Sequence, residues 1–249
     1  MVELVFEDAG TFKRAIDAIA VLIDEAEFII DAKGLALKAT DPSQISMVDF
    51  WLDKSAFKEF KVPGLAKIGL DLNYLSQIMA RAKSKETIEL ALDKDASRLN
   101  IAFKGDGTRR FSVPLIDISA SELPSPKIEF DAEITLASGS LQDSLKDASL
   151  ISSHVSIGTD GEKFFVKAHS SKGTLNNELS KKDKSVKEIK ARKEALSMFP
   201  LDYLQNMIKA ADSGTDVKIH LKSSAPIKIS YSIGAASITY FLAPRIESE

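Results

Sequence analysis

Histidine is rare in this sequence and cysteine is absent, so the side chains most often used as metal ligands, nucleophiles or bases are few. The three histidines are His154, His169 and His220, and no two have the close spacing of a helical metal motif such as H-E-x-x-H. There is no cysteine, which excludes disulfides, thiolate zinc sites and cysteine nucleophiles. His169 and His220 fall in segments that alternate like strands, so we interpret them as structural. We expect no metal site and no catalytic residue.

Glycine and carboxylate motifs also give no catalytic signature. The sequence lacks G-x-S-x-G, a Walker loop and G-x-G-x-x-G, and Gly105-Asp106-Gly107-Thr108 is interpreted as a turn. Asp93-x-Asp95 lacks the glycine and the distal glutamate of a calcium loop. Acidic residues are plentiful, so an enzyme with a hidden carboxylate pair stays open as an alternative. Our expectation is a protein with no enzymatic activity and no cofactor.

Positive charge recurs on the predicted helices. Each of four helical segments carries at least one cation on it or just beyond it: Lys13, Arg14, Arg81, Lys83, Lys85, Lys146 and Lys209. The whole chain has 33 basic and 36 acidic residues and a formal charge of −3, which argues against binding to nucleic acid through a large net positive charge. Singly, each cation fits the solvated face of an amphipathic helix. If the helices share one surface, these cations form a locally basic face.

Apolar periodicity predicts four helices, and alternation predicts the strands between them. The helices are expected over residues 12–23 with Thr11 as N-cap, 72–83 with Asp71 or Asn73 near the start, 140–151, and 201–211 with Pro200 just ahead. Strands are expected over segments such as 27–30, 45–50, 87–92 and 218–221. Asp160-Gly161 is a short hairpin signal.

The sequence matches itself when it is shifted by 129 residues. Asn73-Tyr74-Leu75-x-x-Ile78-Met79-x-x-Ala82 falls on Asp202-Tyr203-Leu204-x-x-Met207-Ile208-x-x-Ala211, since 202 − 73 and 211 − 82 both equal 129. The same shift places Ile88, Leu90 and Leu92 on Val217, Ile219 and Leu221. A fold made twice explains these matches. We therefore predict an α+β protein with two duplicated domains, in each of which helices cover one face of antiparallel sheet.

The boundary between the domains is predicted where the repeat restarts. The stretch from Asp117 to Lys127 has linker composition, and its two prolines favour an extended conformation. We place the first domain at residues 1–117, the connector at 118–127 and the second domain at 128–249. No apolar run approaches the roughly 20 residues of a membrane span, and the N-terminus lacks the features of a signal peptide, so we expect an intracellular protein.

Four segments resemble the sliding clamps of archaeal and eukaryotic DNA replication, the proliferating cell nuclear antigen family. They are Leu22-Ile23-Asp24-Glu25-Ala26, Ala39-Thr40-Asp41-Pro42-Ser43, Pro114-Leu115-Ile116-Asp117 and Leu242-Ala243-Pro244-Arg245-Ile246-Glu247, and the last two are the most specific. With the repeat and the length, the resemblance covers essentially the whole chain. The short linker and the abrupt C-terminus favour an archaeal origin.

The resemblance implies a non-catalytic ring of three subunits, joined head to tail, with helices inside, sheets outside and double-stranded DNA in the hole. The helix cations would face phosphates without reading bases. After loading by a clamp loader, the ring would tether DNA polymerase, flap endonuclease and DNA ligase through short peptides. It would be DNA-associated, in the cytoplasm or nucleoid of an archaeon or in a eukaryotic nucleus. Membership in a heterotrimeric clamp remains an alternative.

The resemblance also assigns two surface sites. Subunit contacts are expected from one edge strand with Arg109, Arg110, Phe111 and Val113, and another with Leu175, Asn177 and Leu179. A partner-peptide pocket is expected from Ile45, Met47, Leu123, Phe241, Ala243 and Pro244, with Gln44 at its polar rim. The alternative reading of Ile45 and Met47 is sheet core. Phe241 stands where eukaryotic relatives usually have tyrosine, so the apolar anchor remains without that hydroxyl.

Some positions depart from the family. Gln77 and Ala80 stand where many relatives carry lysine, while Arg81, Lys83 and Lys85 supply positive charge nearby. Gln142 and Asp143 occupy the repeat positions of Lys13 and Arg14, which leaves the third helix poor in cations. We therefore expect weak direct affinity for DNA.

Overall fold

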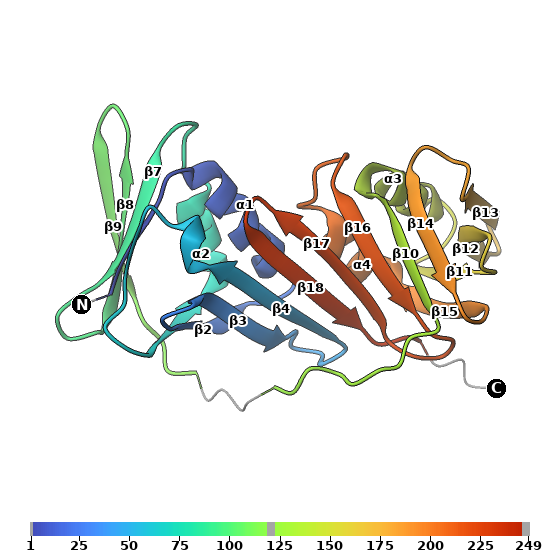
Figure 1. Ribbon diagram of the computed structural model, residues 1–249, viewed down its shortest axis with the longest axis horizontal. Coiled ribbons are helices and arrows are strands. Elements are labelled where there is room, and N and C mark those ends of the chain that lie inside the picture. Colours follow the sequence, from blue (N-terminus) through green and yellow to red (C-terminus); the bar gives the residue numbers. More distant parts are fainter. Residues whose placement is uncertain (1, 119–122, 246–249) are drawn as a thin grey trace. The chain divides into compact units, whose positions relative to one another are not determined.

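The computed structural model describes residues 2–118 and 123–245 (Figure 1). The chain divides into two compact units. The first unit comprises Met1–Gln44, Val48–Pro124 and Ile233–Ile238, and the second comprises Ile45–Met47, Ser125–Ser232 and Thr239–Glu249. Residues 119–122 of the predicted connector, and Ile246 and Glu247 of the C-terminal motif, lie outside the described residues.

The N-terminal half of the chain forms two groups of antiparallel strands. Its strands are β1 (Glu3–Phe6), β2 (Glu25–Ile30), β3 (Gly34–Thr40), β4 (Ser46–Asp53), β5 (Glu59–Lys61), β6 (Ala66–Asp71), β7 (Thr87–Leu92), β8 (Arg98–Lys104) and β9 (Thr108–Pro114). A short 3₁₀ turn, η1 (Lys54–Ala56), follows β4. One sheet has the order β5-β1-β7-β8-β9, and a second group has the order β6-β2-β3-β4.

The C-terminal half repeats this plan. Its strands are β10 (Ala132–Ala137), β11 (His154–Thr159), β12 (Lys163–Ser170), β13 (Gly173–Ser180), β14 (Val186–Ala191), β15 (Ala195–Pro200), β16 (Asp216–Leu221), β17 (Ile227–Ile233) and β18 (Ala236–Leu242). One sheet has the order β13-β12-β11-β15, and another group has the order β14-β10-β16-β17. The duplicated α+β fold predicted from the sequence is confirmed.

Helix α1 (Ala9–Ala20) begins and ends earlier than predicted. Its N-cap is Asp8 rather than Thr11, because the Asp8 carboxylate accepts from the Gly10 N–H at 2.9 Å and from the Thr11 hydroxyl at 2.7 Å. The Thr11 hydrogen bond is the main cause that lowers the pKa of Asp8. Thr11 therefore supports the cap from inside the first turn.

The other helices are α2 (Leu72–Met79), α3 (Ser138–Ser149) and α4 (Leu201–Ile208), and both α2 and α4 are shorter than predicted. Asp71 caps α2 by accepting from the Tyr74 N–H at 2.9 Å, which decides between Asp71 and Asn73. After Met79 the chain tightens, because the N–H groups of Arg81 and Ala82 bond to carbonyls three residues back. Pro200 precedes α4, as predicted.

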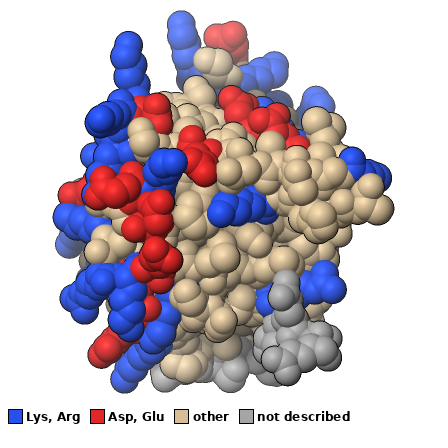
Figure 2. All heavy atoms as spheres, turned by 90° about the vertical axis from the view of Figure 1, so that its right-hand side faces the viewer, with Lys and Arg blue, Asp and Glu red and all other residues tan. Residues whose placement is uncertain are grey.

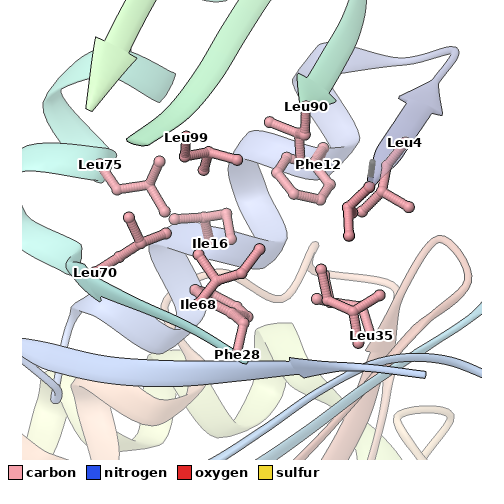
Figure 3. A pocket seen from close by; sticks show the side chains of 12 residues that line it. Leu4, Phe12, Ile16, Phe28, Leu35, Ile68, Leu70, Leu75, Leu90 and Leu99 are labelled. Atoms are coloured by element: carbon pink, nitrogen blue, oxygen red, sulfur yellow. The ribbon is translucent and has the colours of Figure 1, made fainter. Parts of the chain in front are cut away.

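Apolar side chains of the helices and the strands form a core in each unit. Positions related by the 129-residue shift are buried in both, as Ile16 and Leu145 show. The first unit's core encloses a small apolar cavity of about 30 Å³, into which side chains of α1, α2 and several strands point (Figure 3). Among the described residues, no helix is long and apolar enough to cross a membrane.

Candidate nucleic-acid interface and partner surfaces

Helices α1 and α2 pack against each other in the first unit, and a polar contact joins them. Lys13 forms an ion pair with Asp17, one turn further along α1. Asp17 also accepts a hydrogen bond from the Ser76 hydroxyl of α2 at 2.9 Å. The Lys13 side chain is about one-third exposed, and Arg14 beside it is half-buried. Asp17 thus fixes the geometry of the pair and offsets part of the Lys13 charge.

The cations predicted for the second helix lie beyond it. Arg81, Lys83 and Lys85 are exposed on the segment between α2 and β7, because α2 ends at Met79. Lys85 adopts a positive φ of 66°, so this segment turns sharply there. These three side chains therefore project from a loop at the end of the helix rather than from a helical face.

A buried carboxylate anchors this loop to strand β9. Glu86 Oε2 accepts from the Lys83 N–H at 2.8 Å and pairs with the Arg109 guanidinium. Arg109 Nη1 also donates to the Arg81 carbonyl at 2.7 Å. Burial on its own raises the pKa of Glu86, but the hydrogen bonds from Lys83 and Arg109 outweigh it and hold that pKa below the usual value. Arg109 is therefore occupied inside its own unit.

Helices α3 and α4 pack against each other in the second unit, with a different polar contact. The Gln142 amide donates to the carbonyls of Ile208 and Ala211, both at 2.9 Å. Gln142 stands at the repeat position of Lys13. Lys13 supplies a positive charge in the first unit, whereas Gln142 donates hydrogen bonds to carbonyls at the end of α4 in the second unit.

The second helix pair carries less available positive charge than the first. Lys146 on α3 is highly exposed and pairs with Asp143 at 3.2 Å. Lys209 is the C-cap of α4 rather than part of the helix, and it is exposed. Asp147 and Asp202 add negative charge on the same two helices. The second helix pair therefore carries acids as well as the two assigned cations.

The two strands predicted for subunit contacts are both edge strands. Strand β9 ends the sheet β5-β1-β7-β8-β9, and β13 ends the sheet β13-β12-β11-β15. On β9, Arg110 is exposed, Phe111 is half-buried and Val113 is fully buried. Val113 therefore packs inside the first unit, and the surface that β9 offers is its backbone edge with Arg110 and Phe111.

Strand β13 is the second edge strand, and its surface is less charged than that of β9. Leu175, Asn177 and Leu179 are half-buried and alternate with exposed neighbours along the strand. Figure 2 looks onto the end of the second unit that carries β11, β12 and β13. Charges of both signs crowd the left and the top of this view, and the area to their right is mostly uncharged apart from a basic patch near its centre. An edge strand beside an uncharged area is suited to pairing with another strand.

Residues predicted for the partner-peptide pocket include one backbone contact. The Ala243 N–H donates to the Ile45 carbonyl at 2.8 Å. Met47 and Phe241 are buried, and the Lys228 ammonium lies 5.9 Å from the centre of the Phe241 ring. The burial of Met47 agrees with the alternative interpretation that this residue belongs to the core of the sheet.

The remaining pocket residues are more exposed. Gln44 is exposed in a turn with a positive φ of 58°, and Leu123 and Pro244 are half-buried. Gln44 and Leu123 belong to the first unit and the other five residues to the second, so the shared pocket remains a prediction.

The acidic residues that pair with the cations were not singled out from the sequence. Asp17 lies four residues after Lys13, a spacing that signals a helical ion pair. Glu86 and Arg109 are separated by 23 residues, and no local pattern links them. His169 and His220 lie in strands β12 and β16, as predicted, and the described residues contain no group of three or more His, Asp or Glu able to hold a metal.

Comparison with known proteins decides the family. Residues 1–123 match the N-terminal domain of proliferating cell nuclear antigen, and residues 125–246 match its C-terminal domain. The chain belongs to the proliferating cell nuclear antigen family. The two domain models follow each other along the chain, in agreement with the repeat and with the resemblance of the four sequence segments.

Relatives of this proliferating cell nuclear antigen homologue include archaeal DNA polymerase sliding clamps. The chain is 35% identical over 244 residues to the clamp of Methanococcus maripaludis, covering 95% of this chain and 96% of that protein. It is 34% identical over 249 residues to the clamp of Thermofilum pendens, covering 99% and 100%. The similarity to both clamps therefore extends over nearly the whole chain.

Two solved structures agree with this assignment. The fold matches proliferating cell nuclear antigen from Thermococcus kodakaraensis with a TM-score of 0.94 and 24% identity, covering 98% of this chain and 100% of that one. It matches the A. fulgidus protein, solved with the C-terminal region of FEN-1 bound, with a TM-score of 0.91 and 30% identity over all of both chains. The latter protein thus binds a segment of another protein.

Proposed function

We propose that this protein is a DNA sliding clamp that encircles duplex DNA and tethers the replicative polymerase to it. The observation that carries the proposal is the match of both halves, in order, to the two domains of the clamp family. Each half also forms two helices that pack together and have cations on them or just beyond them. Such a protein acts by retention and has no catalytic step of its own.

The DNA contact is electrostatic and independent of sequence. Cations of the first unit face the phosphate backbone, with Lys13 and Arg14 on α1 and Arg81, Lys83 and Lys85 on the following loop. Lys146 and Lys209 contribute from the second unit. Because phosphate contacts carry no sequence information, the clamp slides, and because it surrounds the duplex, weak contacts suffice for retention. This mode of action places it with DNA inside the cell.

The ring closes when strand β9 of one copy pairs with strand β13 of the next. The two edges are different, so the contact is head to tail, and it forms a closed ring when the rotation between copies closes. Three copies are the family's arrangement. The free backbone edges supply hydrogen bonds, while Phe111 on one strand and Leu175 and Leu179 on the other supply apolar area.

Partners dock on the outer surface through short peptides. The A. fulgidus relative binds the C-terminal region of FEN-1, and we assign the same role to the pocket around Phe241 and Met47. Through it the clamp recruits polymerase, flap endonuclease and DNA ligase, and it is loaded by a clamp loader. Each partner is then held near its DNA substrate at a high effective concentration.

The native mass of the purified chain over a concentration series tests ring closure without any partner. A species of about 81 kDa, three times the chain mass of 27.1 kDa, supports a self-closing clamp. A monomer at every concentration contradicts self-closure and leaves a subunit of a heterotrimeric clamp. Substituting Leu175 and Leu179 by Asp together should shift the mass to monomer, whereas Lys172→Asp, in the neighbouring turn, should leave the trimer unchanged.

A further inference from the structure

A hollow of about 640 Å³ lies on the sheet β13-β12-β11-β15 of the second unit. Its volume falls in the range of sites that bind small ligands or short peptide segments. The polar part of its wall comes from Lys167, Arg245, His154, His169, Ser156 and Thr174. Four strands or their flanking segments and the C-terminal tail therefore contribute to one site.

Alternation along the strands places these side chains on one face. On β11, Val155 and Ile157 are buried, while His154 and Ser156 alternate with them. On β12, Lys167 and His169 are exposed, while Val166 and Ala168, which alternate with them, are buried. The backbone register pairs Ser156 with Lys167 and His169 with Thr174, so the polar groups lie next to one another across the sheet.

The C-terminal tail closes one side of the hollow. The Arg245 N–H donates to the carbonyl of Met198 on β15 at 2.7 Å, which holds the tail beside the sheet. Arg245 itself is exposed and lines the hollow together with Met198. The tail residue Ala243, two positions earlier, bonds to Ile45 of the proposed partner-peptide pocket. The hollow and that pocket therefore share the same short stretch of tail.

The described part of the wall carries two cations, Lys167 and Arg245. Among the described residues that line the hollow, none is Asp or Glu. The Lys167 ammonium lies 4.2 Å from the centre of the Phe165 ring, and within the described part of the chain neither Lys167 nor Arg245 forms an ion pair. Glu178, on neighbouring β13, attracts Lys167 electrostatically, but it is hydrogen-bonded to Lys163 at 2.5 Å and to Asn176 at 2.9 Å.

Histidine and hydroxyl groups add neutral donors to these two cations. His154 Nδ1 lies 3.1 Å from the Ser153 hydroxyl, which leaves its other ring nitrogen available to a ligand. Ser156 and Thr174 offer hydroxyls at positions between the charged groups. Paired cations with hydroxyl donors form the kind of site that binds carboxylate or phosphate oxygens.

We propose that this hollow binds the carboxylates of an acidic segment of a partner protein, beside the partner-peptide pocket. Helix α3 packs on β12 and β13 through their buried residues, and the hollow lies on the alternate residues of the same strands. Since the proposed function directs the helices toward DNA, the hollow faces away from DNA and toward tethered proteins. The choice of a protein as the source of the anion thus rests on the proposed function.

The test measures binding of an acetylated, amidated hexaglutamate peptide to the intact protein by calorimetry at physiological salt, with hexaglutamine as the neutral comparison. The double variant Lys167→Glu/Arg245→Glu is compared with the control Lys172→Glu/Lys222→Glu, which makes the same charge change at exposed or half-buried positions outside the hollow. We expect hexaglutamate to bind, hexaglutamine not to bind, and the double variant to bind hexaglutamate at least about tenfold more weakly than the control.

Three results overturn the proposal. The first is an equal loss of hexaglutamate affinity in both double variants, which would mean attraction by general surface charge. The second is tighter binding of inorganic phosphate than of hexaglutamate. The third is competition by a short DNA duplex for the same site. Native mass and stimulation of DNA polymerase on primed DNA are measured for the same variants. If the unmodified protein neither trimerises nor stimulates polymerase, the proposed function fails, and this is visible separately from the peptide result.

Discussion

The two helix pairs have the same packing but different charge. In the first unit, Lys13 and Arg14 on α1 are joined by Arg81, Lys83 and Lys85 on the loop after α2. In the second unit, the helices carry the acids Asp143, Asp147 and Asp202 besides Lys146, and Lys209 is the C-cap of α4; Lys146 is paired with Asp143. The repeat has preserved the apolar positions that build the fold and has exchanged the polar ones.

This difference shows that equivalent positions in the two units of a duplicated fold can have different roles. Gln142, at the repeat position of Lys13, holds the end of α4 instead of supplying a charge. Glu86 and Arg109 anchor the cationic loop of the first unit, whereas their repeat positions hold Thr215 and Ile238, which cannot form that ion pair. The first unit therefore carries more cations on and just after its helices than the second. We expect the first unit to dominate the DNA contact.

Charge reversal in each helix pair should give the largest difference between the units. Arg14→Glu/Arg81→Glu should lower clamp-dependent stimulation of a DNA polymerase at least about tenfold and reduce the salt slope of DNA binding by about 2, roughly 1 for each lost phosphate contact. Lys146→Glu/Lys209→Glu should have a smaller effect, because Asp143 already pairs with Lys146 and the two helices also carry Asp147 and Asp202. Equal effects of the two double variants would contradict the dominance of the first unit.

Removing the carboxylate that anchors the cationic loop should come next in size. Glu86→Gln should lower the free energy of unfolding at pH 7 by about 1–3 kcal/mol, since charged hydrogen bonds to a buried group are lost. Because the folded pKa of Glu86 is lowered, its stabilisation is present above the unfolded value of about 4.3 and is lost as pH falls through the folded pKa.

The control for this variant is Glu89→Gln, which removes the more exposed pair with Lys104. Urea unfolding at pH 7 and at lower pH should show a smaller acid-induced loss of stability in Glu86→Gln than in the unmodified protein, and little change in Glu89→Gln. An unchanged pH dependence in Glu86→Gln would mean that the Glu86–Arg109 pair contributes nothing to stability.

The Gln142 contact between α3 and α4 should contribute more to stability than the Lys13–Asp17 pair of α1, in which Lys13 is the repeat position of Gln142. Gln142→Ala leaves the carbonyls of Ile208 and Ala211 without their side-chain donor and should cost about 1–2 kcal/mol. Lys13→Ala at the repeat position removes a partly exposed ion pair and should cost less than about 1 kcal/mol. Chemical denaturation of both variants measures the difference, and the reverse order would sink this assignment.

Filling the cavity in the core of the first unit should have the smallest effect. Val2 lines the apolar cavity of about 30 Å³, and Val2→Ile should place one more methylene there and raise the free energy of unfolding by about 0.5–1 kcal/mol. Polymerase stimulation should stay unchanged, since the substitution is buried and alters no cation. Destabilisation by this variant would show that the cavity cannot accept the larger side chain without strain.

The sequence predicted the fold because apolar periodicity repeats along the chain, and the same periodicity placed all four helices. It misjudged their ends, since those depend on polar contacts such as the Asp8 cap and the tight turn after Met79. Predicting the helix cations was possible from composition and spacing. Their surroundings were not predictable, because the Glu86–Arg109 contact joins residues that only the folded strands bring together.

The edge strands were predictable from the family resemblance, and both lie at sheet edges. The burial of Val113 was missed, because which side of β9 faces the core depends on its register with β8. The hollow beside Arg245 was also missed. It requires alternate residues of several strands together with a tail that bonds to Met198, and no segment of the sequence shows that combination by itself.

Topological retention on DNA tests the central claim most directly. The protein is loaded onto a nicked circular duplex with a clamp loader and ATP, the complex is isolated by gel filtration, and the DNA is then cut once with a restriction enzyme. A clamp that encircles DNA stays with the circle and is lost after linearisation, because it slides off the ends. Retention that is the same on circular and linear DNA would contradict encirclement and indicate ordinary binding to the duplex.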